Sequence, residues 1–126
     1  MYFRIPFASS GTTTAIPDTQ PGNGAVNWTT GYSNVYQLDP DTDPLALRIE
    51  RAQFNYVMNQ LTATLKQLYE NGVPPFIETA DNGGSPYSYS KDALVKRAGV
   101  VYSSNVNSNT TAPPGANVLL SLMKSN

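Results

Sequence analysis

Residues 43–72 read DPLALRIERAQFNYVMNQLTATLKQLYENG and carry the one long helical pattern in this chain. Within it, five apolar residues follow one another at spacings of four, three, four and three: Phe54, Met58, Leu61, Leu65 and Leu68. These spacings are typical of one face of an α-helix and of a coiled-coil seam. An apolar face of this kind must be buried. Two partners could bury it: a small sheet of the same chain, or further copies of the chain.

Both ends of this helix carry recognisable signals. Asp43 can accept from the free amides of a first turn, and Pro44 suits the first helical position, so we expect the helix to begin there. Asn71-Gly72 can supply a left-handed residue, and Pro74-Pro75 prevents the helix from continuing. The sequence therefore predicts a central helix over residues 43–72.

The residues before the helix show no sustained periodicity. Proline occurs beside apolar residues in two short segments, and it favours extended or turn conformations there. We expect residues 1–42 to form an extended docking arm that packs either on its own domain or on a neighbouring subunit or another protein. The apolar side chains expected to dock are Ile5, Phe7, Ile16, Trp28 and Tyr32.

After the helix the apolar period changes to two. The segments 93–97 and 100–103 flank Ala98-Gly99, a pattern that predicts a β-hairpin. A further apolar run over residues 118–123 could close the sheet. We expect residues 73–126 to form a small antiparallel β domain, so the fold class is α+β and the whole chain is one structural unit.

The composition narrows the class of protein. Charged residues make up 13% of the 126 residues, against about 25% in ordinary globular proteins. Ser, Thr and Asn together contribute 35 residues, which favours loops that hydrogen-bond their own backbone. Compositions of this kind are common in secreted and virion proteins.

The same composition excludes several functions. The chain has no His and no Cys, so Ser-His-Asp, Cys-His and His-ligated metal chemistry are impossible within one chain. A carboxylate pair is the remaining catalytic option, and we expect no enzyme activity and no catalytic, cofactor or metal site. The net charge is −1 and the basic residues are scattered, so we expect no nucleic-acid partner. No apolar run reaches the ~20 residues of a membrane span, so we expect no membrane partner either.

A series of short motifs follows in order along nearly the whole chain. They are Ile5-Pro-Phe-Ala-Ser-Ser-Gly11, Ile16-Pro17, Gly24-Ala-Val-Asn-Trp28, Gly31-Tyr32, Arg51-Ala-Gln-Phe54-Asn55, Tyr87 or Tyr89, Ala93-Leu-Val95, Gly99, Tyr102-Ser103, and Asn109-Thr110 with Pro113. In this order they resemble the N-terminal attachment domain of bacteriophage tail fibre and tailspike proteins. The chain departs from that pattern before the helix at 39–44, at Ser33, and at Leu119-Leu120, where the family often has a Gly-Gly-x-Pro-Pro loop, a proline and a tryptophan.

The resemblance implies a structural virion protein, made in the host cytoplasm and located in the tail. It would act as a homotrimer in which the stripe from Phe54 to Leu68 packs around a threefold axis. The N-terminal arm would then bind tail or baseplate proteins. The C-terminal half also resembles small chitin-binding modules, so a carbohydrate-binding module using Tyr87, Tyr89 or Tyr102 is the alternative.

Overall fold

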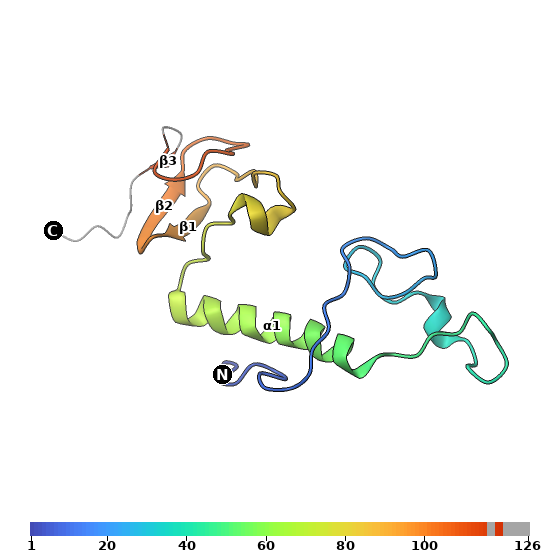
Figure 1. Cartoon of the computed structure of the whole chain (residues 1–126). Helices are drawn as coiled ribbons and strands as arrows, with labels where there is room; N and C mark the ends of the chain where they lie inside the picture. The colour runs from blue at the N-terminus through green and yellow to red at the C-terminus, as the bar shows by residue number, and fades with distance from the viewer. Residues whose placement is uncertain (116–117, 120–126) are drawn as a thin grey trace. The chain divides into compact units, whose positions relative to one another are not determined.

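The structure is a computed structural model in which residues 1–115 and 118–119 are described. Contacts divide the chain into two compact units, Met1–Lys66 (unit 1) and Gln67–Asn126 (unit 2). Figure 1 shows one long helix and a small antiparallel sheet formed by later residues, so the expected α+β class is confirmed. In chain order the elements are η1 (Asn34–Gln37), α1 (Arg51–Asn71), η2 (Thr79–Asn82), β1 (Leu94–Arg97), β2 (Val100–Ser104) and β3 (Val118–Leu119).

α1 begins at Arg51, so the predicted start at Asp43 is wrong. In a helix from Asp43, the Leu47 N–H would donate to the carbonyl of Asp43. It donates instead to Val35 O at 2.9 Å, while the Asp43 side chain accepts from Leu45 N at 2.9 Å. Asp43 therefore closes a turn, and the chain pairs with the η1 region before the helix starts.

The end of α1 follows the prediction. Gly72 has a φ of 74°, and its N–H donates to Leu68 O at 2.8 Å. A left-handed residue directly after the last helical position is the usual way to satisfy the final carbonyls.

Residues 1–42 are not one extended arm. The segment from Ile16 to η1 folds into a set of cross-linked loops, in which Trp28 N donates to Pro17 O at 3.0 Å and Ser33 Oγ donates to Gly24 O at 2.7 Å. A Cβ on Gly24, whose φ is 80°, would lie 2.8 Å from Ser33 Oγ, so this close approach requires glycine. Ile16 and Val26 are buried here.

The predicted hairpin forms the sheet of unit 2. β1 and β2 pair in antiparallel register from Leu94↔Ser103 to Arg97↔Val100. Ala98 and Gly99 both have positive φ, as the tight two-residue turn between twisted strands requires. β3 pairs with β2, which confirms sheet closure for residues 118–119; residues 120–123 lie outside the described part of the chain.

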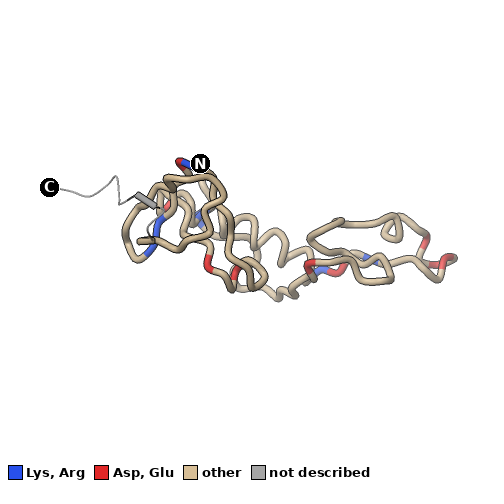
Figure 2. The backbone as a smooth tube through the Cα atoms, turned by 90° about the horizontal axis from the view of Figure 1, so that it is seen from above, with Lys and Arg blue, Asp and Glu red and all other residues tan. Residues whose placement is uncertain are grey.

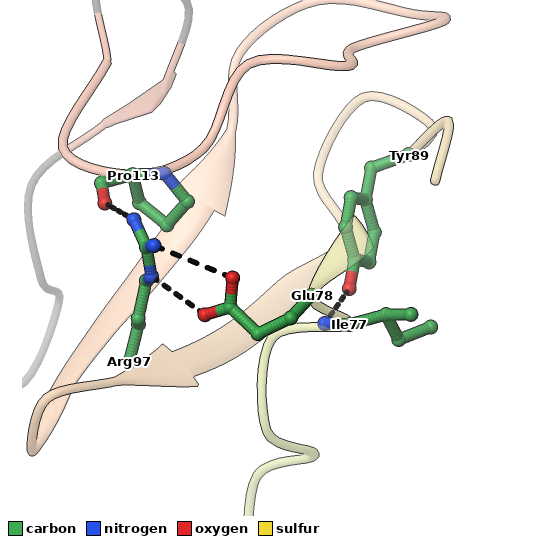
Figure 3. A network of polar contacts seen from close by, with 5 residues as sticks. All are labelled: Ile77, Glu78, Tyr89, Arg97 and Pro113. Carbon is green, nitrogen blue, oxygen red and sulfur yellow. Dashed lines mark hydrogen bonds and ion pairs between the residues drawn. The ribbon is translucent and has the colours of Figure 1, made fainter. Parts of the chain in front are cut away.

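One polar network connects the hairpin of unit 2 to the loops around it (Figure 3). Arg97 Nη1 donates to Pro113 O at 2.6 Å, and Arg97 Nε lies 3.1 Å from Glu78 Oε1. The guanidinium also lies over the Phe76 ring, 5.1 Å from its centroid. Close by, Ile77 N donates to the Tyr89 hydroxyl, whose pKa is raised by burial.

We expect Arg97→Met to lower the free energy of unfolding by about 1–3 kcal/mol, because Arg97 satisfies a carbonyl of buried Pro113. Glu78→Gln should cost less than about 1 kcal/mol, since both partners of that ion pair are partly exposed. Urea denaturation of the two variants measures the difference. Equal losses would show that the ion pair, and not the carbonyl contact, is the stabilising interaction.

Candidate assembly interface

One face of α1 in unit 1 is a row of polar side chains that binds the backbone of the N-terminal residues. Asn55, Asn59 and Thr62 follow at spacings of four and three, so they share one side of the helix. Asn55 Nδ2 donates to Thr12 O at 3.2 Å, and Asn59 Nδ2 donates to Phe7 O at 2.9 Å. We call residues 5–14, which lie along this face, the arm segment.

Thr62 is the central residue of this contact. It is the buried residue of α1, with 3% of its surface exposed. Its Oγ1 accepts from Phe7 N at 2.8 Å and donates to Met58 O at 2.8 Å. Together with Asn59 it binds both backbone groups of Phe7, which sets the position of the arm segment along the helix.

Thr62→Val should release the arm segment, because it keeps the shape of the side chain but removes the acceptor for Phe7 N. We expect a loss of about 1–3 kcal/mol in the free energy of unfolding. Amide hydrogen exchange over residues 5–14 should become roughly ten- to hundredfold faster. Thr62→Ser keeps the hydroxyl and serves as the control; similar exchange in both variants would contradict this role of Thr62.

The arm segment is held mainly through its backbone, and its large side chains remain available. Ile5 and Phe7 are exposed, Phe7 by 45%. Residues 5–17 contain no charged side chain. The backbone hydrogen bonds hold the arm segment on the helix and leave its uncharged, apolar side-chain surface exposed.

A second face of α1 is the apolar stripe. Phe54 and Leu61 are exposed by 43% and 55%, while Met58, Leu65 and Leu68 are half-buried. Residues 52–65 form nearly four turns without one charged side chain, and Figure 2 accordingly shows no blue or red along this part of the tube. An uncharged helix surface with large exposed apolar residues is typical of a protein–protein interface.

A third feature lies on the other flank of the stripe. It is a surface groove lined by Trp28, Val57, Gln60, Leu61 and Thr64, which we call the Trp28 groove. The Trp28 ring contacts the Tyr56 ring with centroids 6.2 Å apart, and 48% of Trp28 is exposed. A half-exposed tryptophan next to an exposed leucine is a strong candidate for a binding hot spot.

Asn27 holds Trp28 in this position. Asn27 is 1% exposed; its Nδ2 donates to Ala25 O and Thr30 Oγ1, and its Oδ1 accepts from Thr29 N and Thr30 N. All four bonds are between 2.8 and 3.0 Å. Asn27-Trp28-Thr29 has the sequence pattern of an N-glycosylation acceptor. The amide nitrogen of Asn27 is occupied and buried, so this segment is a structural turn in the folded protein and not an exposed glycan acceptor.

The residues predicted for docking separate into two groups. Ile5, Phe7, Trp28 and Tyr32 are exposed, whereas Ile16 is buried in unit 1 and is removed from the docking surface. Although 42% of Tyr32 is exposed, partial burial of its hydroxyl, followed by the negative charge of an ionised Tyr36 beside it, raises the pKa of Tyr32. Sequence reasoning missed the residues that bind the arm segment and Trp28, namely Asn27, Asn55, Asn59 and Thr62. For Asn55, Asn59 and Thr62 the available signal was their four- and three-residue spacing on the helix.

The aromatic residues considered for sugar binding do not form one exposed platform in unit 2. Tyr102 is buried and Tyr89 half-buried, while Tyr87 is exposed. Tyr87 and Tyr89 contact each other edge to face, with centroids 4.7 Å apart. The Tyr102 ring is therefore part of the core and cannot stack on a ligand from solvent.

Among residues 1–115 and 118–119, no group of three His, Cys, Asp or Glu side chains could hold a metal ion. Over the same part of the chain, no helix is both long and apolar enough to cross a membrane.

Models of known protein families and the curated proteins contain no match to this chain. The contacts of the arm segment, the stripe and the Trp28 groove are therefore the basis for a functional inference.

Proposed function

We propose that this protein anchors a homotrimeric tail fibre or tailspike to the tail or baseplate of a bacteriophage. It would act as a structural attachment or adaptor domain of the virion. The proposal combines the order of motifs along the chain with the uncharged, exposed stripe of α1. Its function would be the burial of interfaces, without chemistry at any residue.

The stripe is the observation that carries the proposal. Phe54 and Leu61 are exposed in the single protomer, and burying a Phe or Leu side chain contributes about 1.5–3 kcal/mol. Two heptads are too short to form a bundle as isolated peptides. Here the arm segment already binds the helix through Thr12 and Phe7, so association need not order the helix first.

The absence of charge along the stripe favours a partner with the same surface. When identical helices pack around a symmetry axis, each residue lies near its own copies, and like charges would repel. Residues 52–65 avoid that repulsion because they carry no charge. A threefold seam of Phe54, Met58, Leu61, Leu65 and Leu68 is therefore physically consistent.

Two measurements test the proposal. Light scattering at micromolar concentration should give three times the 13.6 kDa mass of one chain. Electron microscopy of phage particles carrying an epitope on this chain should place the label where the fibre meets the tail. A monomer in solution would contradict the trimeric seam, and label away from the tail would contradict the attachment role.

A further inference from the structure

The arm segment and the Trp28 groove occur at the same position along α1. Phe7 is bonded to Asn59 and Thr62, so it lies beside residues 59–62 of the helix. The groove is lined from α1 by residues from Val57 to Thr64, whose midpoint lies between 60 and 61. The exposed Phe7 side chain and the Trp28 groove therefore lie at the same position along the axis of α1.

They lie on opposite flanks of the stripe. At about 100° per residue, the row formed by Asn55, Asn59 and Thr62 is roughly 110° to one side of the stripe. The groove residues on α1 centre roughly 70° to the other side. A single protomer cannot bring the Phe7 side chain into its own groove, because the helix lies between them.

In a parallel bundle, one flank of each helix faces the opposite flank of its neighbour at the same height. We propose that Ile5 and Phe7 of each arm segment occupy the Trp28 groove of the next subunit, an inference that rests on the proposed parallel trimer. The contact is head-to-tail, and it closes into a ring at three copies. An antiparallel pair would instead bring arm segment against arm segment, leaving both grooves empty.

The absence of charge on both surfaces agrees with a second copy as the occupant. Neither residues 5–17 nor residues 52–65 carry a charge, so no charge is buried without a partner. The exposed parts of Ile5, Phe7, Trp28, Phe54 and Leu61 offer roughly 500 Å² per protomer. In a ring of three, each protomer divides this area between two neighbours, so the arm contact adds to the area of the half-buried stripe and does not by itself reach the ~800 Å² per partner of a standard interface.

Engineered disulfides test the contact directly, because the chain has no native cysteine. The variant Phe7→Cys with Gln60→Cys should form covalent trimers on mild oxidation, seen on non-reducing gels. A link within one chain is not possible, since the two positions lie on opposite sides of a helix ~10 Å wide and a disulfide needs Cβ atoms ~4 Å apart. Each single variant should give no covalent trimer.

The matched control is Phe7→Cys with Gln53→Cys. Gln53 is the same residue type on the same face, one heptad earlier and about 10 Å away along the helix. We expect at least tenfold less covalent trimer from it. Native mass is measured first: a trimer that links equally through positions 53 and 60 would overturn this inference and leave the proposed function intact, whereas a monomer would overturn both.

Trp28 gives a second measurement, because it is the sole tryptophan of the chain. Filling the groove should shield its ring, so Phe7→Ser in the trimer should shift Trp28 emission to longer wavelength. Phe3→Ser is the control. The Phe3 side chain is about as exposed as that of Phe7, but Phe3 lies four residues before Phe7, the residue that α1 holds at the level of the groove. Identical emission in the two trimeric variants would contradict the contact between Phe7 and the groove.

Discussion

Replacing Leu61 and Leu65 together with Asp is expected to convert the trimer into monomers. Leu61 is 55% exposed in the single protomer, so a charge there should be tolerated by the protomer itself. In the assembly, three carboxylates at each position would lie around the axis without partners. Each buried unpaired charge costs several kcal/mol, which exceeds what the remaining stripe residues can contribute.

Light scattering measures the outcome, with circular dichroism to confirm that the helix remains. The matched control is Gln67→Asp with Asn71→Asp, which adds the same charge at exposed helix positions outside the stripe. We expect the control to keep the mass of the wild type. If the Leu61 and Leu65 variant keeps the trimeric mass, α1 is not the seam and another surface must hold the chains together.

Asn27→Asp is expected to destabilise unit 1 by about 3–5 kcal/mol. The substitution preserves shape but replaces the Nδ2 donor with an oxygen that faces the Ala25 carbonyl at about the former hydrogen-bond distance of 3.0 Å. The carboxylate keeps the Thr29 and Thr30 N–H donors on one oxygen, but its other oxygen is buried against the Ala25 carbonyl, in the loop that fixes Trp28. Loss of this turn should also displace the Trp28 side chain and so change the shape of the Trp28 groove, because Trp28 follows Asn27 directly.

Chemical denaturation followed by Trp28 fluorescence measures this effect, since the reporter lies beside the substitution. Asn23→Asp is the control, because Asn23 acts through Oδ1, which accepts from Ala25 N at 3.0 Å on an exposed loop. An aspartate there keeps the acceptor, and the change should stay within about 0.5 kcal/mol. Equal destabilisation at both positions would contradict a special role for the buried amide.

Local sequence signals predicted the hairpin and the end of the helix correctly, for a local reason. Ala98-Gly99 can adopt the two positive φ angles of a tight turn, and Gly72 can adopt one after α1. These choices depend on a few neighbouring residues. The start of α1 could not be found in this way, because it depends on Val35 O, which accepts from Leu47 N across the fold.

The sequence predicted one part of the candidate interface and not the other. The apolar stripe follows from spacing alone, and Phe54 and Leu61 are exposed as an interface requires. The polar row that binds the arm segment was not recognised, because Asn and Thr on a helix usually face solvent. Their role emerges only when the backbone of Phe7 and Thr12 lies against them.

The sequence by itself determined the α+β class, the hairpin, the stripe and the lack of charge over residues 52–65, since each follows from local propensity or periodicity. Only the tertiary structure decided where α1 begins, that Ile16 is buried, and that Asn27 positions Trp28. It also decided the height at which Phe7 is held on the helix. The start of α1 and the position of Phe7 depend on hydrogen bonds between residues 12 and 55 positions apart, and no local pattern specifies such partners.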